Sequence, residues 1–135
     1  MNTTAIIPAG GKGTRFGGDL PKQYSELAGI PIIIRSASVF QATEEVDSIV
    51  LSVHSDYYNL MNELVDKYDL TKVKEVVIGG VERQDSVTNA LHTKSAEQAD
   101  IILVHDAVRP LLTSDLVQRV IEETEEYGAV IPGRE

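Results

Sequence analysis

The sequence predicts an α/β fold built on an open, mostly parallel sheet with helices on both faces. Short β-branched runs alternate with longer stretches of helical period, which is typical of βαβ units. The runs at Ile6-Ile7 and Ile101–Val104 are apolar without alternation, as expected of central strands covered on both faces. A glycine-rich loop follows the first run, where open α/β sheets bind ligands. Together these observations indicate a Rossmann-like sheet.

The strands and helices can be placed along the chain. Strands are expected at Thr4–Pro8, Ser48–Val53, Val73–Ile78, Ile101–Val104 and Ala129–Ile131. Helices are expected at Pro31–Ala42, Asp56–Tyr68, Gln84–Thr93 and Ser114–Tyr127. Pro31 suits a first helical position because its φ is fixed, Ser55 or Asp56 can cap the second helix, and Gly128 ends the last.

Composition limits the classes of function. A chain of 135 residues with 42% hydrophobic content predicts a single domain over residues 1–135. There are no cysteines, which excludes disulfides and thiolate metal sites and predicts a cytoplasmic protein. The net charge of −9 disfavours nucleic acid and anionic membranes as partners, and no apolar run is long enough to span a bilayer. An anionic small molecule would need a local basic patch, which Lys12, Arg15 and Lys22 provide.

The loop after the first strand predicts a phosphate site. Small residues from Ala9 through Gly10, Gly11, Gly13 and Thr14 let backbone N–H groups approach phosphate oxygens closely. A P-loop is excluded because Asp19 and Leu20 stand where Lys and Ser/Thr are needed, and a dinucleotide fingerprint fails at Phe16. The cationic loop also disfavours a flavodoxin-like domain. With Pro21-Lys22 included, the segment resembles the nucleotidyltransferase signature Gly-x-Gly-x-x-Arg followed by Pro-Lys.

Two further motifs follow later strands. In Gly79-Gly80-Val81-Glu82-Arg83-Gln84-Asp85-Ser86-Val87, the Gly80 and Val81 backbone and the Ser86 hydroxyl can line a slot for a pyrimidine, although ordinary capping by Asp85 and Ser86 explains the pattern too. In Val104-His105-Asp106-Ala107-Val108-Arg109-Pro110, Asp106 can bind Mg²⁺ or ribose hydroxyls, or merely form a turn, and Arg109 can meet an acceptor phosphate. His105 is expected to be packed or capping.

The three motifs together resemble the 2-C-methyl-D-erythritol 4-phosphate cytidylyltransferase family of isoprenoid synthesis, over essentially the whole chain. The resemblance implies a nucleotide-diphospho-sugar transferase type of fold, CTP as substrate, Mg²⁺ as cofactor and a homodimer for the full-length protein. It also implies that Arg15 and Lys22 stabilise the transition state. The implied nucleotide-binding residues are Ala9, Gly10, Gly11, Gly13, Thr14, Gly80, Val81, Arg83, Ser86, Asp106 and Arg109, with Asp106 also holding the metal.

Two departures from the family pattern matter. Family loops often begin Pro-Ala-Ala-Gly, whereas this loop reads Pro8-Ala9-Gly10-Gly11, a difference that a backbone contact at Gly10 survives. Family members also continue well past a strand equivalent to Ala129–Ile131, so we expect a domain that is incomplete at its C-terminus. We therefore expect transfer by these 135 residues alone to be impaired or lost. The alternatives are a ribitol-5-phosphate cytidylyltransferase, which the Asp106 motif suits equally, and a non-catalytic CTP-binding fragment.

Overall fold

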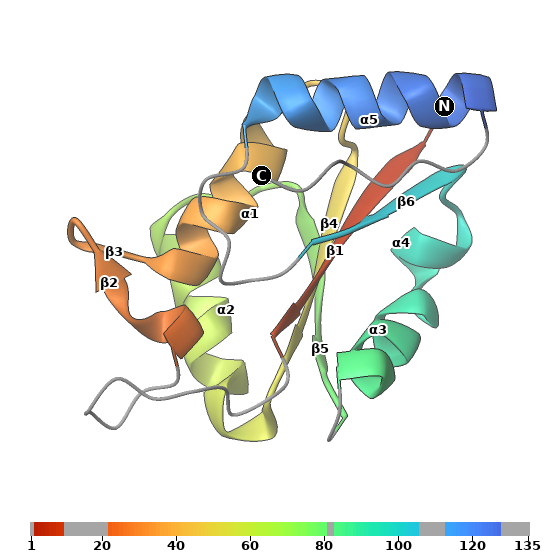
Figure 1. Cartoon of the computed structure of the whole chain (residues 1–135). Helices are drawn as coiled ribbons and strands as arrows, with labels where there is room; N and C mark the ends of the chain where they lie inside the picture. Colours follow the sequence, from red (N-terminus) through yellow and green to blue (C-terminus); the bar gives the residue numbers. More distant parts are fainter. Residues whose placement is uncertain (1, 10–21, 81–82, 106–112, 128–135) are drawn as a thin grey trace.

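The centre of the molecule is a four-stranded sheet in the order β5-β4-β1-β6 (Figure 1). The computed structural model describes residues 2–9, 22–80, 83–105 and 113–127. Its strands are β1 (Thr3–Ala9), β4 (Ser48–Val53), β5 (Val73–Ile78) and β6 (Ile101–Val104), and every pairing among them is parallel. The α/β prediction is confirmed, and three of these strands have the expected bounds. The strand predicted at Ala129–Ile131 lies outside the described residues.

The strand order reverses beside β1. From β1 the chain moves outward to β4 and β5 through α1 (Ile32–Ala42) and α2 (Tyr58–Lys67), which cover one face. It returns through α3 (Arg83–Leu91) and the short α4 (Lys94–Glu97) on the other face, and forms β6 on the far side of β1. In such doubly wound sheets the ligand crevice lies outside the carboxyl ends of the strands where the order reverses. Here those strands are β1 and β6.

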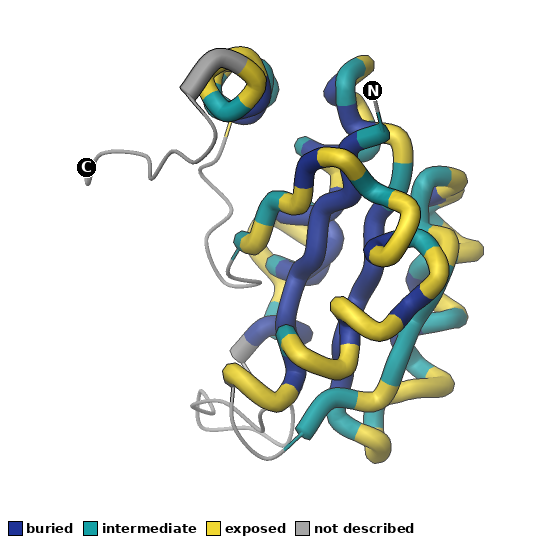
Figure 2. The backbone as a smooth tube through the Cα atoms, turned by 90° about the vertical axis from the view of Figure 1, so that its right-hand side faces the viewer, coloured by how far each residue is buried: buried dark blue, intermediate teal, exposed yellow. Residues whose placement is uncertain are grey.

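Two hydrophobic layers hold the sheet between its helices. On one face Ile7, Leu51 and their neighbours pack against Phe40 of α1, Met61 of α2 and residues of α5 (Ser114–Tyr127). On the other face Ile6 and Val50 meet Ala90 and Ala96, whose small side chains let α3 and α4 lie close to the sheet. Every residue of β1 is buried, as predicted for a central strand (Figure 2). Each large aliphatic side chain buried in this way contributes roughly 1.5–3 kcal/mol.

Strand β6 differs from the expectation of a strand covered on both faces. Ile102 and Val104 are 38% and 44% exposed, whereas Ile101 is buried. Among the described strands β6 pairs with β1 alone, and α3 and α4 leave the side chains of Ile102 and Val104 partly exposed. An apolar run therefore did not distinguish a strand covered on one face from a strand covered on both.

A small hairpin that the sequence did not predict precedes α1. It follows a single 3-10 turn, η1 (Lys22–Tyr24), and consists of β2 (Glu26–Leu27) and β3 (Ile30–Pro31), paired antiparallel. Ala28 and Gly29 have φ of 55° and 82°, the positive values of a primed hairpin turn. Pro31 pairs with Glu26 and has ψ of 140°, so it caps α1 instead of forming its first turn.

The other helices begin and end close to their predicted bounds. A 3-10 turn, η2 (Ser55–Tyr57), precedes α2, and its cap is His54 instead of Ser55 or Asp56. The helix expected at Gln84–Thr93 ends at Leu91, and the short α4 follows it without having been predicted. The Thr93 hydroxyl accepts a hydrogen bond from the Ala96 amide at 3.3 Å and caps α4. Helix α5 has the predicted bounds. Within the described ranges, no helix has the length and apolar character needed to cross a bilayer.

Candidate functional site at the carboxyl edge of the sheet

The carboxyl edge of the sheet carries every described residue that the sequence predicts to bind nucleotide. Ala9 ends β1, Gly80 follows β5, and Ser86 lies in the first turn of α3. Lys22 is the first residue of η1 and Arg83 is the first residue of α3, so the backbone of each lies at this edge. The remaining predicted residues lie outside the described ranges: Gly10, Gly11, Gly13, Thr14, Arg15, Val81, Asp106 and Arg109.

Hydrogen bonds fix the points from which the chain leaves the sheet. The Gly79 amide donates to the Val53 carbonyl at 2.7 Å, and the His105 amide donates to the Ile6 carbonyl at 3.0 Å. The His105 ring packs edge-on against Phe40 with ring centroids 5.6 Å apart, which confirms the prediction of a packed histidine. Asp106, the predicted metal ligand, is the next residue along the chain from this fixed position.

Gly80 lies where only a glycine fits. A Cβ added at residue 80 would stand 2.1 Å from the Cβ of Asp85, far inside van der Waals contact. The requirement is for space, because Asp85 occupies the first turn of α3 directly against the Gly80 backbone. The glycine therefore lets the segment after β5 approach the beginning of α3.

The backbone of Ser86 is fixed by a hydrogen bond, whereas its side-chain hydroxyl makes none within the described residues. The Ser52 hydroxyl of β4 donates to the Ser86 carbonyl at 2.8 Å and ties the first turn of α3 to the sheet. The Ser86 side chain is 0% exposed, and within the described part of the chain its Oγ has no hydrogen-bond partner. Buried hydroxyls are rarely left unsatisfied in native proteins. An oxygen in this state is suited to bonding a ligand.

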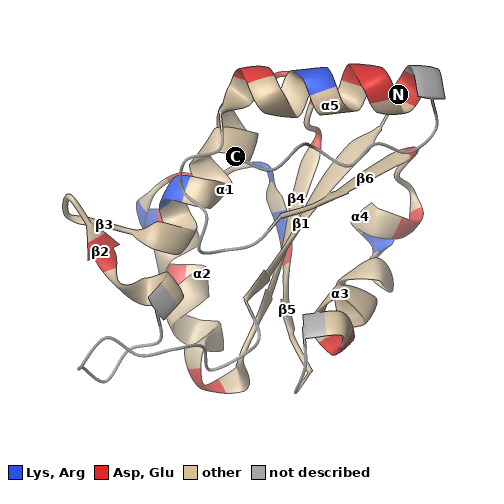
Figure 3. Ribbon diagram, in the orientation of Figure 1, with Lys and Arg blue, Asp and Glu red and all other residues tan. Residues whose placement is uncertain are grey.

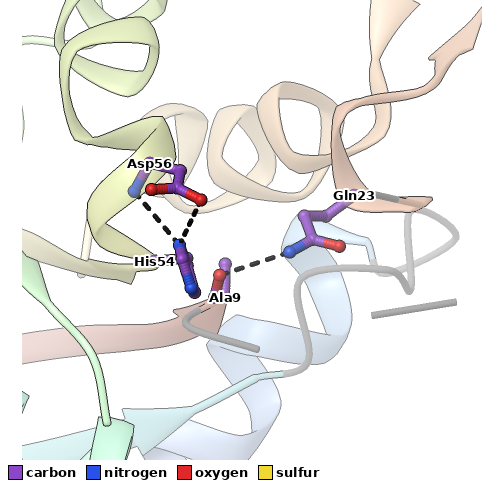
Figure 4. Close-up of polar contacts among 4 residues, drawn as sticks. All are labelled: Ala9, Gln23, His54 and Asp56. Atoms are coloured by element: carbon purple, nitrogen blue, oxygen red, sulfur yellow. Dashed lines mark hydrogen bonds and ion pairs between the residues drawn. The ribbon is translucent and has the colours of Figure 1, made fainter. Parts of the chain in front are cut away.

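A cluster beside the end of β1 was not predicted. The Gln23 side chain is 4% exposed, and its Nε2 donates to the Ala9 carbonyl at 3.2 Å (Figure 4). Tyr24 stacks on Tyr57 with ring centroids 4.8 Å apart. Burial raises the pKa of the Tyr24 hydroxyl above its ordinary value, and Tyr57 adds a smaller effect in the same direction. A glutamine beside a lysine in a polar stretch gives no sequence signal of burial, so this cluster could not be foreseen.

His54 follows β4 at the same edge and acts as a helix cap. Its Nδ1 accepts a hydrogen bond from the Asp56 amide at 3.1 Å, so the neutral ring carries its proton on Nε2 (Figure 4). Asp56 Oδ2 also lies 3.6 Å from Nδ1, but with that nitrogen accepting, the contact is no hydrogen bond. The hydrogen bond from the Asp56 amide accounts for the position of the His54 ring. We therefore assign His54 to capping the turn before α2.

Charge is distributed unevenly over the molecule. Acidic residues mark α5, which lies beyond the amino ends of the strands, away from the candidate site (Figure 3). Asp115, Glu122, Glu123 and Glu125 of this helix are exposed. This arrangement keeps part of the net charge of −9 away from the edge where an anion would bind.

In the described ranges no group of three His, Cys, Asp or Glu side chains could hold a metal ion.

Comparisons with known proteins match nearly the whole chain to one family. The sequence model described as 2-C-methyl-D-erythritol 4-phosphate cytidylyltransferase matches residues 3–134. A curated relative of that name from Clostridium botulinum (strain Okra / Type B1) is 39% identical over 130 residues, which cover 96% of this chain and 56% of the relative. This chain thus spans a little over half the length of that relative.

Solved structures share the fold. A crystal structure of 4-diphosphocytidyl-2C-methyl-D-erythritol synthase from Anaerococcus prevotii superposes with a TM-score of 0.76 at 25% identity, covering 93% of this chain and 51% of that one. A CMP:2-keto-3-deoxy-manno-octonic acid synthetase gives 0.74 at 14% identity, covering 96% and 50%, and supports the fold alone. With the family match over residues 3–134, the chain belongs to the 2-C-methyl-D-erythritol 4-phosphate cytidylyltransferase family.

Proposed function

We propose that this chain binds CTP at the carboxyl ends of β1 and β6, and that the whole protein transfers the cytidylyl group to 2-C-methyl-D-erythritol 4-phosphate with release of pyrophosphate. Family membership supports the choice of reaction. The observation that carries the proposal is the buried Ser86 Oγ, which has no partner within the described part of the chain. It lies in the helix turn that packs on Gly80, at the edge where doubly wound sheets bind ligands.

The proposed nucleotide contacts are those that the family resemblance implies, and the chemistry of the residues supports them. The backbone of Gly80 and Val81 and the Ser86 hydroxyl recognise the cytosine, and Arg83 is assigned to the same part of the site. The loop from Ala9 through Gly10, Gly11, Gly13 and Thr14 offers N–H groups to the phosphates. A pyrimidine amine and carbonyl can exchange hydrogen bonds with a hydroxyl and backbone groups, so this set can distinguish cytosine from uracil.

Transfer requires stabilisation of charge on the reacting phosphate. A phosphate oxygen of the acceptor attacks the α-phosphorus of CTP in line, the new P–O bond forms, and the bond to the β-phosphate oxygen breaks as pyrophosphate leaves. Arg15 and Lys22 neutralise the charge on the non-bridging oxygens, the arginine as a bidentate donor and the lysine as a point charge. Arg109 is assigned to the acceptor phosphate.

Mg²⁺ is proposed with Asp106 as its protein ligand. The described residues contain no group of three His, Cys, Asp or Glu side chains that could hold a metal ion, and Asp106 lies outside them. Mg²⁺ bound to nucleotides takes only one or two carboxylates besides phosphate oxygens and water, so a single aspartate fits its chemistry. When bound, the ion would reduce the negative charge of the triphosphate.

Calorimetry with CTP and UTP tests the binding proposal. We expect CTP to bind, UTP to bind more weakly, and Ser86→Ala to lose at least part of the discrimination because a cytosine contact is removed. Thr88→Ala, on the exposed side of the same helix, is the matched control and is expected to keep the wild-type preference. Absence of CTP binding by the wild-type chain would overturn the proposal.

Pyrophosphate release tests transfer separately. The chain is incubated with CTP, Mg²⁺ and methylerythritol phosphate, and ribitol 5-phosphate serves as the competing acceptor. Release that depends on methylerythritol phosphate supports catalysis by these 135 residues. Binding without release assigns them to nucleotide binding only. The homodimer, the cytoplasmic location and the lack of a nucleic-acid partner stay predictions, the first of which light scattering would test.

A further inference from the structure

We propose that Gln23 is a positioning residue, whose side-chain amide fixes Lys22 relative to the end of β1. The inference rests on the proposed function, in which Lys22 contacts the triphosphate. Gln23 Nε2 donates to the Ala9 carbonyl at 3.2 Å, and both residues are buried. Lys22 and Gln23 are adjacent in η1, so the position of the lysine backbone follows from this hydrogen bond.

The contact joins the two ends of the predicted phosphate loop. Ala9 is the last described residue before that loop and Lys22 is the first after it. In general, a contact between the residues that flank a loop lowers the entropic cost of bringing the two ends of the loop together. The hydrogen bond also lies in a water-excluded position, where it is stronger and where a missing partner is more unfavourable. The Gln23 amide therefore fixes Ala9 and the backbone of Lys22 relative to each other before CTP arrives.

Neighbouring contacts hold the same turn on other sides. Tyr24 is 3% exposed and stacks on Tyr57 at 4.8 Å, so η1 is fixed against the turn before α2. The Ser25 carbonyl accepts a hydrogen bond from the Ile32 amide at 2.9 Å, which fixes it to the first turn of α1. Residues 23, 24 and 25 thus contact three different elements. Of these contacts, only that of Gln23 reaches the strand from which the loop begins.

The side-chain chemistry is specific to an amide. A carbonyl oxygen needs a donor, and a neutral donor in a buried position avoids the desolvation of a charge. Gln23→Met keeps the side-chain length and removes the donor. Gln23→Glu keeps the shape and places an acceptor against the Ala9 carbonyl. Thr43→Val is the matched control, because the buried Thr43 makes another side-chain-to-backbone bond, 2.7 Å to the Val39 carbonyl, before the amino end of β4.

A double-mutant cycle measured by CTP calorimetry tests the positioning role. We expect Gln23→Met to weaken CTP binding about fivefold in the wild-type background, the effect of one hydrogen bond. In the Lys22→Met background the same change should weaken it less than twofold, because no ammonium group is left to position. Thr43→Val should leave CTP affinity unchanged. An equal loss in both backgrounds would show that Gln23 supports structure only, and would overturn the inference. If Gln23→Met does not fold, Gln23→Glu replaces it in the cycle.

Exchange of side-chain amide hydrogens in the wild-type chain tests the contact without a nucleotide. By NMR, the Nε2 hydrogens of Gln23 should exchange at least tenfold more slowly than those of the exposed Gln98. Equal rates would overturn the contact even if CTP binds. Slow exchange in a chain that does not bind CTP would instead retain the contact and overturn the proposed function.

Discussion

At the beginning of α3, the side chain of Asp85 packs against the backbone of Gly80. The Cβ and Cγ of Asp85 occupy the space that a side chain at residue 80 would need. The same helical turn carries Ser86, whose carbonyl is bonded to Ser52. A displacement of Asp85 would therefore reach the one buried hydroxyl that the proposed cytosine site uses.

Gly80→Ala is expected to lower both stability and CTP affinity. Insertion of a methyl group into a filled space typically lowers the free energy of unfolding by about 1–3 kcal/mol. Urea denaturation and CTP calorimetry measure the two effects. Gly29→Ala is the control, since it has open space but a φ of +82°: it should lose about 1–2 kcal/mol with unchanged CTP affinity. A fully retained affinity in Gly80→Ala would contradict the link between this glycine and the site.

Ser52→Ala should destabilise the protein more than Thr88→Ala does. Both changes remove a hydroxyl that donates to a carbonyl of α3 at 2.8 Å, but Ser52 is fully buried and Thr88 is exposed. Loss of the buried bond is expected to lower the free energy of unfolding by about 1–2 kcal/mol, and loss of the exposed one by less than about 0.5 kcal/mol. Chemical denaturation at neutral pH compares them, and equal losses would argue against a special role for the contact between β4 and α3.

Tyr24 predicts a loss of stability in alkaline solution. Burial raises its pKa in the folded state above the ordinary value of 10.0, so the folded state holds this proton more tightly than the unfolded state does. Below pH 10 both states keep the proton, so the free energy of unfolding does not change with the titration of Tyr24. Above pH 10 the unfolded state loses the proton first, and the free energy of unfolding decreases as the pH rises. Urea midpoints between pH 8 and pH 11 should therefore fall more steeply in the wild type than in Tyr24→Phe. At neutral pH Tyr24→Phe should be about 1 kcal/mol more stable, because a buried hydroxyl without a described partner is removed.

Tyr58→Phe is the control for that experiment. Tyr58 is exposed, so its replacement should leave the alkaline decrease of the wild type in place. If Tyr24→Phe declines as steeply as the wild type, the buried tyrosine is not the group responsible.

Ala28→Asn should stabilise the hairpin before α1. Ala28 is exposed and has a φ of 55°, which asparagine tolerates better than alanine does. A gain of about 0.5–1 kcal/mol in unfolding free energy is expected from thermal or urea denaturation. The same substitution at Ala42, exposed in the last turn of α1, should lose a few tenths of a kcal/mol because asparagine is the poorer helix former. Equal signs at both positions would exclude backbone conformation as the cause.

The larger elements could be predicted because period and strand composition determine them locally. Ser48–Val53 and Ser114–Tyr127 were placed with their observed bounds, since each has a strong pattern and clear ends. The hairpin at Glu26–Pro31 was missed because strands of two residues carry no period, and Ala28 is an unusual residue at a positive φ. The exposure of Ile102 and Val104 in β6 could not be predicted, because it depends on how far α3 and α4 extend over the sheet.

The residues of the candidate site likewise fall into those that the sequence predicts and those that it does not. Gly80 and Ser86 could be singled out because glycine and a small hydroxyl residue after a strand form a recognisable local motif. Gln23 and Ser52 could not, since their roles arise from contacts with Ala9 and Ser86, which lie 14 and 34 residues away in sequence. Long-range hydrogen bonds of this kind leave no trace in local composition.

The central place of β1 has a consequence for synthesis on the ribosome. Its neighbours are β4 and β6, and Thr3 pairs with Ile101. The first strand to emerge must therefore wait for a partner that is translated roughly 5–20 s later at ordinary elongation rates. During that interval the backbone groups of β1 that later pair with β6 have no partner strand. Nascent chains of this topology should engage chaperones early, and slowing of translation after β4 should lengthen that dependence.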